Sequence, residues 1–425
     1  MGPARPATAS RTHRPQDATT SARVTVLVPA HDEGDRITDT LAGLRRQTLL
    51  PDRVVVVADN CSDDTAALAR AAGAEVFETV GNRDKKAGAL NQAWRLRFRR
   101  KADGDRRTAD QRTGEQRSEV SWHAGCERRE RRDRRQTLRR GPQRRTAGTV
   151  LVPDAADDDL LLVQDADSRL DPEFIAAAAR HVLGDESMGA VGGTFRGEAG
   201  GGLIGHLQRN EYARYARDVR RLKGKCLVVT GTAAMFRAAT LRRVSEARRD
   251  GRLPRGDGQG GIYDTSVLTE DNELTFAILH LGYSVLSPKE CTLVTEVMPT
   301  WRDLWSQRLR WKRGAVENCV QYGLTRITWR YWGRQLLTLA GVLVTFLYLS
   351  SLGISLVAAG GIGVQPFWLA ITGIFVLERV VTIRDRGWRH MLAAGFMYEL
   401  LYDLFLQIVH ARAYADAPLR RERRW

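Results

Sequence analysis

The feature that most limits the fold of this chain is an alternation of short apolar runs and helix-like segments near the N-terminus. The apolar runs are Val24–Val28, Val54–Val57 and Ala74–Phe77. The helix-like segments between them are Ile37–Arg46 and the alanine-rich Thr65–Ala72. Strands that alternate with helices form mostly parallel sheets that are covered on both faces. We therefore predict an α/β fold.

Acidic or polar loops follow three of the predicted strands. They read PAHDE at Pro29–Glu33, ADNCSDD at Ala58–Asp64 and QDADS at Gln164–Ser168. In sheets of this kind, ligands bind at the carboxyl ends of the strands. The three loops are therefore expected to meet at one edge of the sheet, which is the predicted binding site.

Asp165 and Asp167 follow the apolar run Leu160–Val163 and have one residue between them. In an extended chain both carboxylates would lie on one face, where they would repel each other. A bound divalent cation would remove this repulsion. An ordinary turn is the alternative, because aspartate is common where strands end. The other acidic loops at the same edge favour the metal site.

Two further motifs follow later in the chain. Thr269-Glu270-Asp271 precedes an apolar helical pattern, so these residues can cap a helix and interact with its dipole. The same position offers an oriented carboxylate that can serve as a general base. QRLRW, at Gln307–Trp311, lies shortly before long apolar segments, where arginine and tryptophan are also typical interfacial anchors.

A membrane domain is predicted at residues 323–411. Leu336–Val357 contains 22 residues without a charge, about the length that crosses a bilayer, and a second span is predicted at about 360–382. The loop between the spans has no lysine or arginine, and by the positive-inside rule the large domain is cytoplasmic. The protein is therefore expected to be a multi-pass protein of the cell membrane. The flanking basic residues are Lys312, Arg313, Arg326, Arg330, Arg334, Arg384, Arg386 and Arg389.

A third apolar segment, residues 391–409, has two interpretations. Its polar residues Glu399, Asp403 and Gln407 are spaced by four and form one stripe on a helix. If this helix crossed the membrane, the basic tail at 412–425 would lie outside, against the positive-inside rule. We favour a helix that lies in the cytoplasmic interface. A third span with a functional polar face is the alternative.

Charge and composition separate two other parts of the chain. The net charge is +16, and Arg95–Arg145 alone holds 19 Lys and Arg against 8 Asp and Glu. The insertion at about 99–156 has few large apolar residues and cannot bury enough surface to order itself. We interpret it as a solvated disordered loop with no specific nucleic-acid partner, although its charge could attract nucleic acid or anionic lipid.

Residues 1–22 lack the apolar segment of a secretory signal and are a predicted disordered tail. The five cysteines are scattered, which fits a reducing compartment.

Taken in order, seven motifs of this chain resemble those of the family 2 glycosyltransferases. They are PAHDE, ADNCSDDT, DKKAGALNQA, VQDADS, TGTAAMFR, TED and QRLRW. The likeness is greatest to the membrane-bound processive type: cellulose, chitin and hyaluronan synthases and the Nod-factor chitooligosaccharide synthase. It covers about residues 24–322 and most of the membrane part. DxD, TED and QxxRW together are far more specific than any one of them.

The resemblance implies a GT-A fold for residues 23–322 and inverting transfer from a nucleotide-diphosphate sugar, UDP-glucose or UDP-N-acetylglucosamine, to a saccharide acceptor. It implies that Asp271 is the catalytic base, with Glu270 beside it. The donor-binding residues would be Pro29, Glu33, Asp59, Lys86 and Asp165. Asp167 and Asp165 would hold Mg²⁺ or Mn²⁺, with Asp167 the more direct ligand. The residues for the acceptor sugar and the diphosphate would be Gln307, Arg310, Trp311, Gly231 and Thr232.

The sequence departs from the family in three respects. Ala58 stands where many members have the first of two adjacent aspartates, and the arginine-rich insertion is longer than usual. Only two spans are clear, so a channel could require an oligomer or a partner. A non-processive transferase with a lipid or polyprenyl-phosphate acceptor is therefore the main alternative. An inactive membrane-tethered binding protein is the alternative outside enzymes.

Overall fold

The computed structural model describes residues 22–97, 157–359 and 366–417. The arginine-rich insertion at 99–156 lies outside these residues, as do 1–21, 360–365 and 418–425. The predictions made for the N-terminal tail, the insertion, the start of the second span and the end of the basic tail therefore stay predictions. The chain divides into two units, residues 93–155 and the remainder, and only 93–97 of the smaller unit are described.

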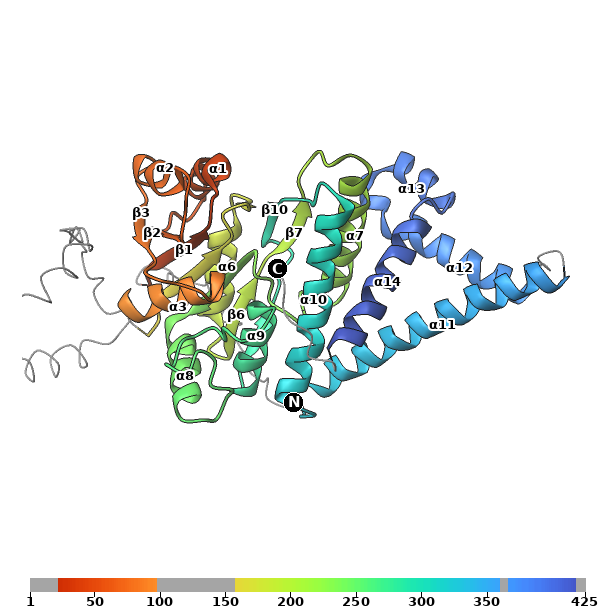
Figure 1. The fold of residues 1–425 in the computed structure, drawn as a ribbon. Coiled ribbons are helices and arrows are strands. Elements are labelled where there is room, and N and C mark those ends of the chain that lie inside the picture. The colour runs from red at the N-terminus through yellow and green to blue at the C-terminus, as the bar shows by residue number, and fades with distance from the viewer. Residues whose placement is uncertain (1–21, 98–156, 360–365, 418–425) are drawn as a thin grey trace, which may run out of the picture. The chain divides into compact units, whose positions relative to one another are not determined.

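A seven-stranded sheet forms the centre of the α/β part that the structure describes (Figure 1). Its strand order is β3-β2-β1-β4-β8-β6-β9. Neighbours β3 (Glu75–Glu78), β2 (Arg53–Ala58), β1 (Val24–Ala30) and β4 (Leu160–Gln164) run parallel. Val26 and Leu27 point to opposite faces of β1, and both are fully buried. The sheet is therefore covered on both faces, as the apolar runs predict.

Helices connect these strands in the predicted order. They are α1 (Gly34–Arg45), α2 (Thr65–Ala71) and α3 (Lys85–Arg97). In α1, Ile37, Leu41 and Leu44 are buried against the sheet at helical spacing. The predicted α/β fold is confirmed in this half of the domain.

The second half of the sheet departs from purely parallel order. β8 (Ala233–Arg237) lies between β4 and β6 (Met188–Gly192) and runs antiparallel to both. β9 (Ser284–Leu286) then pairs parallel with β6. The sheet is thus mostly parallel, as predicted. Helices α6 (Phe174–Gly184), α8 (Ala238–Arg249) and α9 (Glu270–His280) accompany this half.

A smaller three-stranded sheet and two long helices complete the part of the chain that precedes α11. The strand order of this sheet is β5-β10-β7. The strands are β5 (Arg169–Leu170), β10 (Thr292–Thr295) and β7 (Thr194–Gly197). Helix α7 (Gly202–Arg221) follows β7, and helix α10 (Trp301–Tyr322) follows β10. Thr300 caps α10 by accepting a hydrogen bond from the backbone N–H of Asp303.

A buried ion pair fixes α9 against α8. The guanidinium of Arg248 donates to both carboxylate oxygens of Glu273, at 2.6 and 3.1 Å, and neither side chain is exposed. Tyr322 of α10 donates a third hydrogen bond to Glu273, at 2.6 Å. Because α9 begins with Glu270 and Asp271, this network holds the helix that presents the TED motif.

Among the described residues, four α-helices follow α10: α11 (Trp329–Ala359), α12 (Pro366–Thr382), α13 (Trp388–Gly395) and α14 (Leu400–Asp416). By length and composition, one helix among the described residues can cross a membrane, and it corresponds to α11. Helices α13 and α14 satisfy the same criterion only as a pair, with a bend of 71° between them. The prediction of several spans is therefore supported for the first span alone.

The predicted helix at 391–409 is interrupted. Met397 has a positive φ of 53°, and α14 begins after Glu399. Glu399 and Asp403 of the predicted polar stripe pair with Arg379 of α12, at 3.3 and 2.6 Å. Glu399 also pairs with Arg214 of α7 at 2.5 Å. The stripe thus faces charged partners on other helices. Whether this segment lies in the interface or crosses the membrane stays a prediction.

Candidate active site

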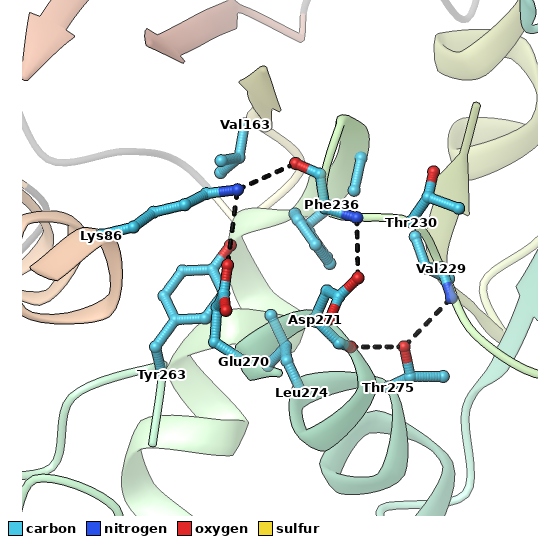
Figure 2. Close-up of a pocket in the computed structure, with 12 residues that line it drawn as sticks. Lys86, Val163, Val229, Thr230, Phe236, Tyr263, Glu270, Asp271, Leu274 and Thr275 are labelled. Atoms are coloured by element: carbon cyan, nitrogen blue, oxygen red, sulfur yellow. Dashed lines mark hydrogen bonds and ion pairs between the residues drawn. The ribbon is translucent and has the colours of Figure 1, made fainter. Parts of the chain in front are cut away.

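Lys86 links the predicted donor loop to the TED motif. Its Nζ lies 2.5 Å from Asp165 Oδ1 and 3.4 Å from Glu270 Oε1, and Figure 2 shows the contact with Glu270. It also donates to the carbonyl oxygen of Gly231 at 3.1 Å. Lys86 is the second residue of α3, Asp165 follows β4 and Glu270 begins α9. Three elements that are far apart in the sequence therefore meet at one ammonium group.

Asp271 is oriented by two backbone donors. The N–H of Gly231 donates to its Oδ2 at 3.0 Å, and the N–H of Asn272 donates to its Oδ1 at 2.8 Å. A Cβ at Gly231 would lie 3.3 Å from the Cβ of Asp271 and 3.4 Å from Nζ of Lys86. The absence of a side chain at Gly231 therefore allows this close approach of the backbone.

Burial changes the proton affinity of these groups. It raises the pKa of Asp271 to about 6, and the charge of Glu270 acts in the same direction. Burial also raises the pKa of Asp165 to about 6, although Lys86 opposes the change. For Lys86 itself, burial would lower the pKa, but the charges of Asp165 and Glu270 outweigh burial and raise it. Lys86 is therefore a permanent positive charge among carboxylates.

Asp167 lies beside a second group of charges. Its Oδ1 accepts a hydrogen bond from Ser168 at 2.9 Å, and burial raises its pKa. Asp167 lines a pocket together with Glu198, which follows β7. Arg36 and other residues of α1 line the same pocket, as do residues of β5 and β10. Arg36 is already paired with Glu198 at 3.1 Å and with Glu296 at 2.9 Å. The positive charges near Asp167 are thus partly neutralised by other carboxylates.

The donor set fits a divalent metal. Asp165 and Asp167 supply carboxylate oxygens, the ligand type that Mg²⁺ and Mn²⁺ prefer. Among the described residues, Asp167 accepts one side-chain hydrogen bond, from Ser168, whereas Asp165 is engaged by Lys86. That Asp167 is the more direct ligand stays a prediction.

Glu33 and Asp59 lie on the loops after β1 and β2. Burial raises the pKa of Glu33 to about 7, and repulsion from Asp167 adds to this effect. Asp59 is buried and accepts hydrogen bonds from Thr79 at 2.7 Å and Asn60 at 3.0 Å. Pro29 lies within β1, opposite Val57 of β2. The loops meet at the carboxyl ends of the parallel strands, as predicted.

Thr232 and Thr269 connect the site motifs to neighbouring elements by hydrogen bonds. The carbonyl of Thr232 accepts a hydrogen bond from the N–H of Asp165 at 3.0 Å. Thr269 precedes α9 but makes no capping hydrogen bond with its side chain, contrary to the capping interpretation. Its Oγ1 and its carbonyl instead accept from Asn318 of α10, both at 3.1 Å. Thr269 thus connects the TED motif to the helix that carries QRLRW.

Arg308 organises the QRLRW motif. Its Nη1 donates to Gln307 Oε1 at 2.7 Å, and its guanidinium lies 4.4 Å from the centre of the Trp311 ring. Its Nη2 donates to Glu211 of α7 at 2.8 Å. For Arg310, no side-chain hydrogen bond or ion pair appears among the residues that the structure describes. Arg310 therefore has its donors available for a ligand.

Sequence reasoning missed three residues of this site: Arg308, Glu211 and Tyr263. Tyr263 is buried and lines a second pocket, which Lys86, Glu270 and Asp271 also line (Figure 2). The QxxRW pattern does not specify the residue at position 308, so it did not indicate Arg308. Its place next to Gln307 in a helix with a buried face is the signal that could have found it. Nothing in the sequence marks Glu211 or Tyr263.

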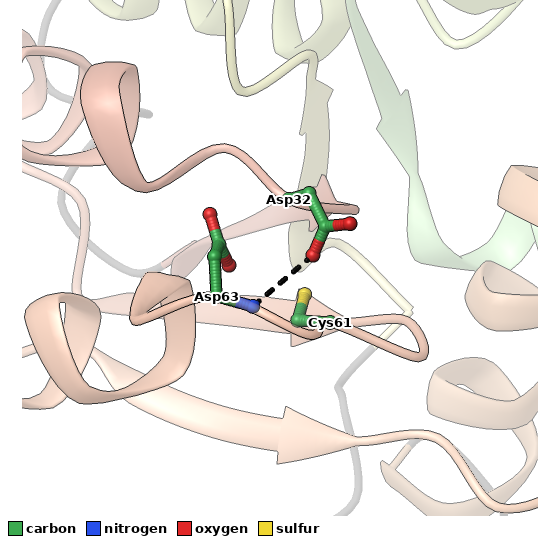
Figure 3. Close-up of side chains that lie close together, drawn as sticks. All are labelled: Asp32, Cys61 and Asp63. Carbon is green, nitrogen blue, oxygen red and sulfur yellow. Dashed lines mark hydrogen bonds between the residues drawn. The ribbon is translucent and has the colours of Figure 1, made fainter.

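A separate acidic cluster lies on the loops after β1 and β2. Asp32, Cys61 and Asp63 place potential ligand atoms within 4.8 Å of one another (Figure 3). The backbone N–H groups of Ser62 and Asp63 already donate to Asp32, at 2.6 and 3.3 Å. These hydrogen bonds account for the arrangement as a contact between two loops.

Comparison with known proteins decides the family. The family model described as "Glycosyl transferase family group 2" matches residues 160–382, which is more than half of the chain. The chain belongs to this family. The related model "Glycosyl transferase family 2" matches residues 25–96, so the two matches flank the arginine-rich insertion. The glycosyltransferase assignment made from the motifs is confirmed.

Named relatives agree with this family. The poly-beta-1,6-N-acetyl-D-glucosamine synthase of Staphylococcus aureus is 22% identical over 300 residues, which cover 69% of this chain and 55% of the relative. The probable glycosyltransferase YdaM of Bacillus subtilis is 26% identical over 156 residues, which cover 37% of this chain and 34% of the relative. The glycosyltransferase chain thus spans about half the length or less of these curated relatives.

A solved structure supports the predicted fold. The mannosyltransferase PcManGT of Pyrobaculum calidifontis, in complex with GDP-Man and Mn²⁺, aligns with a TM-score of 0.55 and 18% identity. The alignment covers 95% of this glycosyltransferase and 89% of that chain. The GT-A-like α/β fold is therefore confirmed.

Proposed function

We propose that this glycosyltransferase catalyses inverting transfer of a sugar from a UDP-sugar to a hydroxyl group of a saccharide acceptor. The observation that carries the proposal is the group formed by Lys86, Asp165 and Glu270, which brings the DAD motif next to the TED motif. A donor diphosphate and an attacking hydroxyl must meet at such a junction. UDP-N-acetylglucosamine is the first donor to test, because a synthase of poly-N-acetylglucosamine is among the relatives. UDP-glucose is the second.

In the proposed mechanism, Asp271 is the general base. Its carboxylate is held by the N–H groups of Gly231 and Asn272, which fix its orientation and leave lone pairs for an acceptor hydroxyl. Proton removal by Asp271 assists attack of that hydroxyl on the anomeric carbon. A single displacement inverts the configuration at this carbon, so the reaction requires no covalent nucleophile.

Lys86, Asp165 and Asp167 would serve the donor diphosphate. Asp167, with Asp165, would hold Mg²⁺ or Mn²⁺, which supplies positive charge next to the leaving nucleoside diphosphate. Lys86 balances the carboxylates from the opposite side and presents a fixed cation to the same region. Glu33 and Asp59 would contact the nucleoside, and Pro29 would shape the loop that follows β1.

The acceptor would bind beside QRLRW. Trp311 offers an aromatic face for a sugar ring, and Arg310 and Gln307 offer polar groups within the same N-terminal half of α10. We further propose that the reaction takes place at the cytoplasmic face of the membrane, with α11 as an anchor. The apolar composition of α11 and the basic residues around it support this arrangement.

Donor turnover tests the proposal directly. The purified chain in detergent would receive a panel of UDP- and GDP-sugars with Mn²⁺ or Mg²⁺, and nucleoside diphosphate release would be measured with and without EDTA. We expect metal-dependent release with one UDP-sugar and loss of release in Asp271→Asn. Asp250→Asn is the matched control, because Asp250 is exposed at the end of α8. Release that persists in Asp271→Asn would contradict the assigned base.

Product length tests processivity. With N-acetylglucosamine oligosaccharides as acceptors, a processive enzyme yields long products while most of the acceptor is still unused. Products that never exceed one added sugar would contradict processive synthesis and favour a single-transfer enzyme. Transfer to extracted lipid, but not to oligosaccharides, would contradict the saccharide acceptor.

A further inference from the structure

We infer that Glu211 and Tyr402 are positioning residues for the QRLRW motif, so that the C-terminal helix α14 is a part of the acceptor site. This inference rests on the proposed function, in which Trp311 and Gln307 bind the acceptor. Glu211 belongs to α7, Tyr402 to α14 and the motif to α10. The three helices meet at a single carboxylate oxygen.

That oxygen is Glu211 Oε2. It accepts a hydrogen bond from Arg308 Nη2 at 2.8 Å and another from the hydroxyl of Tyr402 at 2.5 Å. The side chain of Arg308 is 5% exposed, and Tyr402 is fully buried. A buried guanidinium needs a fixed counter-charge, and Glu211 provides it. Tyr402 in turn fixes the position of the carboxylate.

Arg308 in turn contacts two other side chains of the motif, those of Gln307 and Trp311. Its Nη1 donates to Gln307 Oε1 at 2.7 Å, and the same planar group lies 4.4 Å from the centre of the Trp311 ring. A guanidinium can bond in its plane and stack on its face at the same time, which an ammonium cannot do. The positions of the Trp311 ring and of the Gln307 amide therefore depend on the position of the Glu211 carboxylate.

The packing of α14 supports a link to the motif. Tyr402 belongs to an apolar cluster with Leu304, which lies one turn before Gln307 on α10, and with Leu207 of α7. Trp301 and Trp305 of α10 contact Phe405 of α14, with ring centres 5.0 and 5.9 Å apart. The hydroxyl of Tyr402 thus enters a firmly packed interface, where its hydrogen bond has one geometry.

The variants Tyr402→Phe and Glu211→Gln test the inference. In the purified full-length chain with UDP-N-acetylglucosamine and Mn²⁺, each should raise the KM for chitotetraose about fivefold, the effect of losing the net contribution of one typical hydrogen bond. The KM for the donor should change by less than the KM for chitotetraose. Arg308→Lys should resemble Glu211→Gln. The double variant should be no worse than Glu211→Gln alone, because both changes act on one contact.

Tyr414→Phe is the matched control. Tyr414 also lies on α14 and donates to Gln335 of α11, at 2.7 Å to the carbonyl oxygen. This variant loses the same kind of hydrogen bond without touching Arg308, so its KM for chitotetraose should equal that of the wild type. A general loosening of α14 would raise the KM in Tyr402→Phe and Tyr414→Phe alike, and that result would overturn the inference.

Binding measurements separate this inference from the proposed function. Calorimetric titration with chitotetraose needs no turnover, and we expect weaker binding to Tyr402→Phe and Glu211→Gln than to the wild type. A wild type that binds chitotetraose but releases no UDP would contradict the proposed reaction, while the same titration would still decide the positioning role. Equal binding by all variants, or no binding by the wild type, would overturn the inference.

Discussion

Lys86 Nζ lies 2.5 Å from Asp165 Oδ1, although 79 residues separate the two in the sequence. The same ammonium lies 3.4 Å from Glu270. In this glycosyltransferase the cation therefore joins the carboxylate pair of the proposed metal site to the motif that carries the proposed base. The predictions below follow from this group of charges and from the packing that holds it.

Replacement of Lys86 by methionine should reduce donor turnover about 100-fold, in line with the loss of one preorganised charge at a reacting centre. The carboxylates of Asp165 and Glu270 would then face each other without a cation. Steady-state UDP release measures the effect. Lys85→Met is the control, because Lys85 is the exposed neighbour and makes no ion pair among the described residues. Equal losses in both variants would contradict the role of Lys86.

Activity should depend on the ionisation of Asp271. Burial raises its pKa to about 6, and a general base must be deprotonated. The rate should therefore be nearly constant above about pH 7 and fall about tenfold for each pH unit below about 5. Initial rates from about pH 4 to about pH 8 at saturating donor measure this profile. A melting temperature that is constant over the same range would exclude acid unfolding, and a rate that rises toward low pH would contradict the assignment.

Asp167→Asn should weaken the binding of the metal more than it weakens the binding of the nucleotide. The neutral amide removes one negative ligand, so the Mn²⁺ concentration for half-maximal activity should rise about tenfold or more. Titration with Mn²⁺ at fixed UDP-sugar measures the shift. Asp171→Asn is the matched control in the same stretch, because Asp171 pairs with Arg196 at 2.7 Å and lies outside the charge group. An unchanged Mn²⁺ requirement in Asp167→Asn would assign the metal to other residues.

Glu273→Gln should destabilise the fold by about 3–5 kcal/mol, because the buried guanidinium of Arg248 would lose its counter-charge. Denaturant unfolding in detergent, followed by tryptophan fluorescence, measures the change. The double variant Arg248→Met with Glu273→Leu should recover part of this loss, since apolar residues need no counter-charge.

Asp250→Asn is the control for stability. It breaks the ion pair between Asp250 and Arg252, whose two side chains are each 60% exposed. The substitution should therefore change the free energy of unfolding by less than about 1 kcal/mol. A loss in Glu273→Gln no larger than in this control would show that the buried pair does not stabilise α9.

Local patterns in the sequence were sufficient for the α/β class of the fold and for many residues of the candidate site. The alternation of apolar runs and helices gave the parallel half of the sheet, because strand and helix periodicities are properties of neighbouring residues. The acidic loops at the strand ends then indicated Asp165, Asp167 and Glu33, since parallel strands bring their carboxyl ends together. Asp271 and Lys86 came from motifs, and the structure brings them to the same place.

Only the tertiary structure decided which charges pair. The sequence predicted that Lys86 approaches a diphosphate, but it could not reveal that the ammonium also bridges Asp165 and Glu270. It likewise indicated neither Glu211 nor Tyr402, because ion pairs between α7, α10 and α14 depend on how the helices pack. The break between α13 and α14 escaped the apolar pattern for the same reason. Periodicity determines which face of an element is buried, whereas the partners on that face are set by residues far away in the chain.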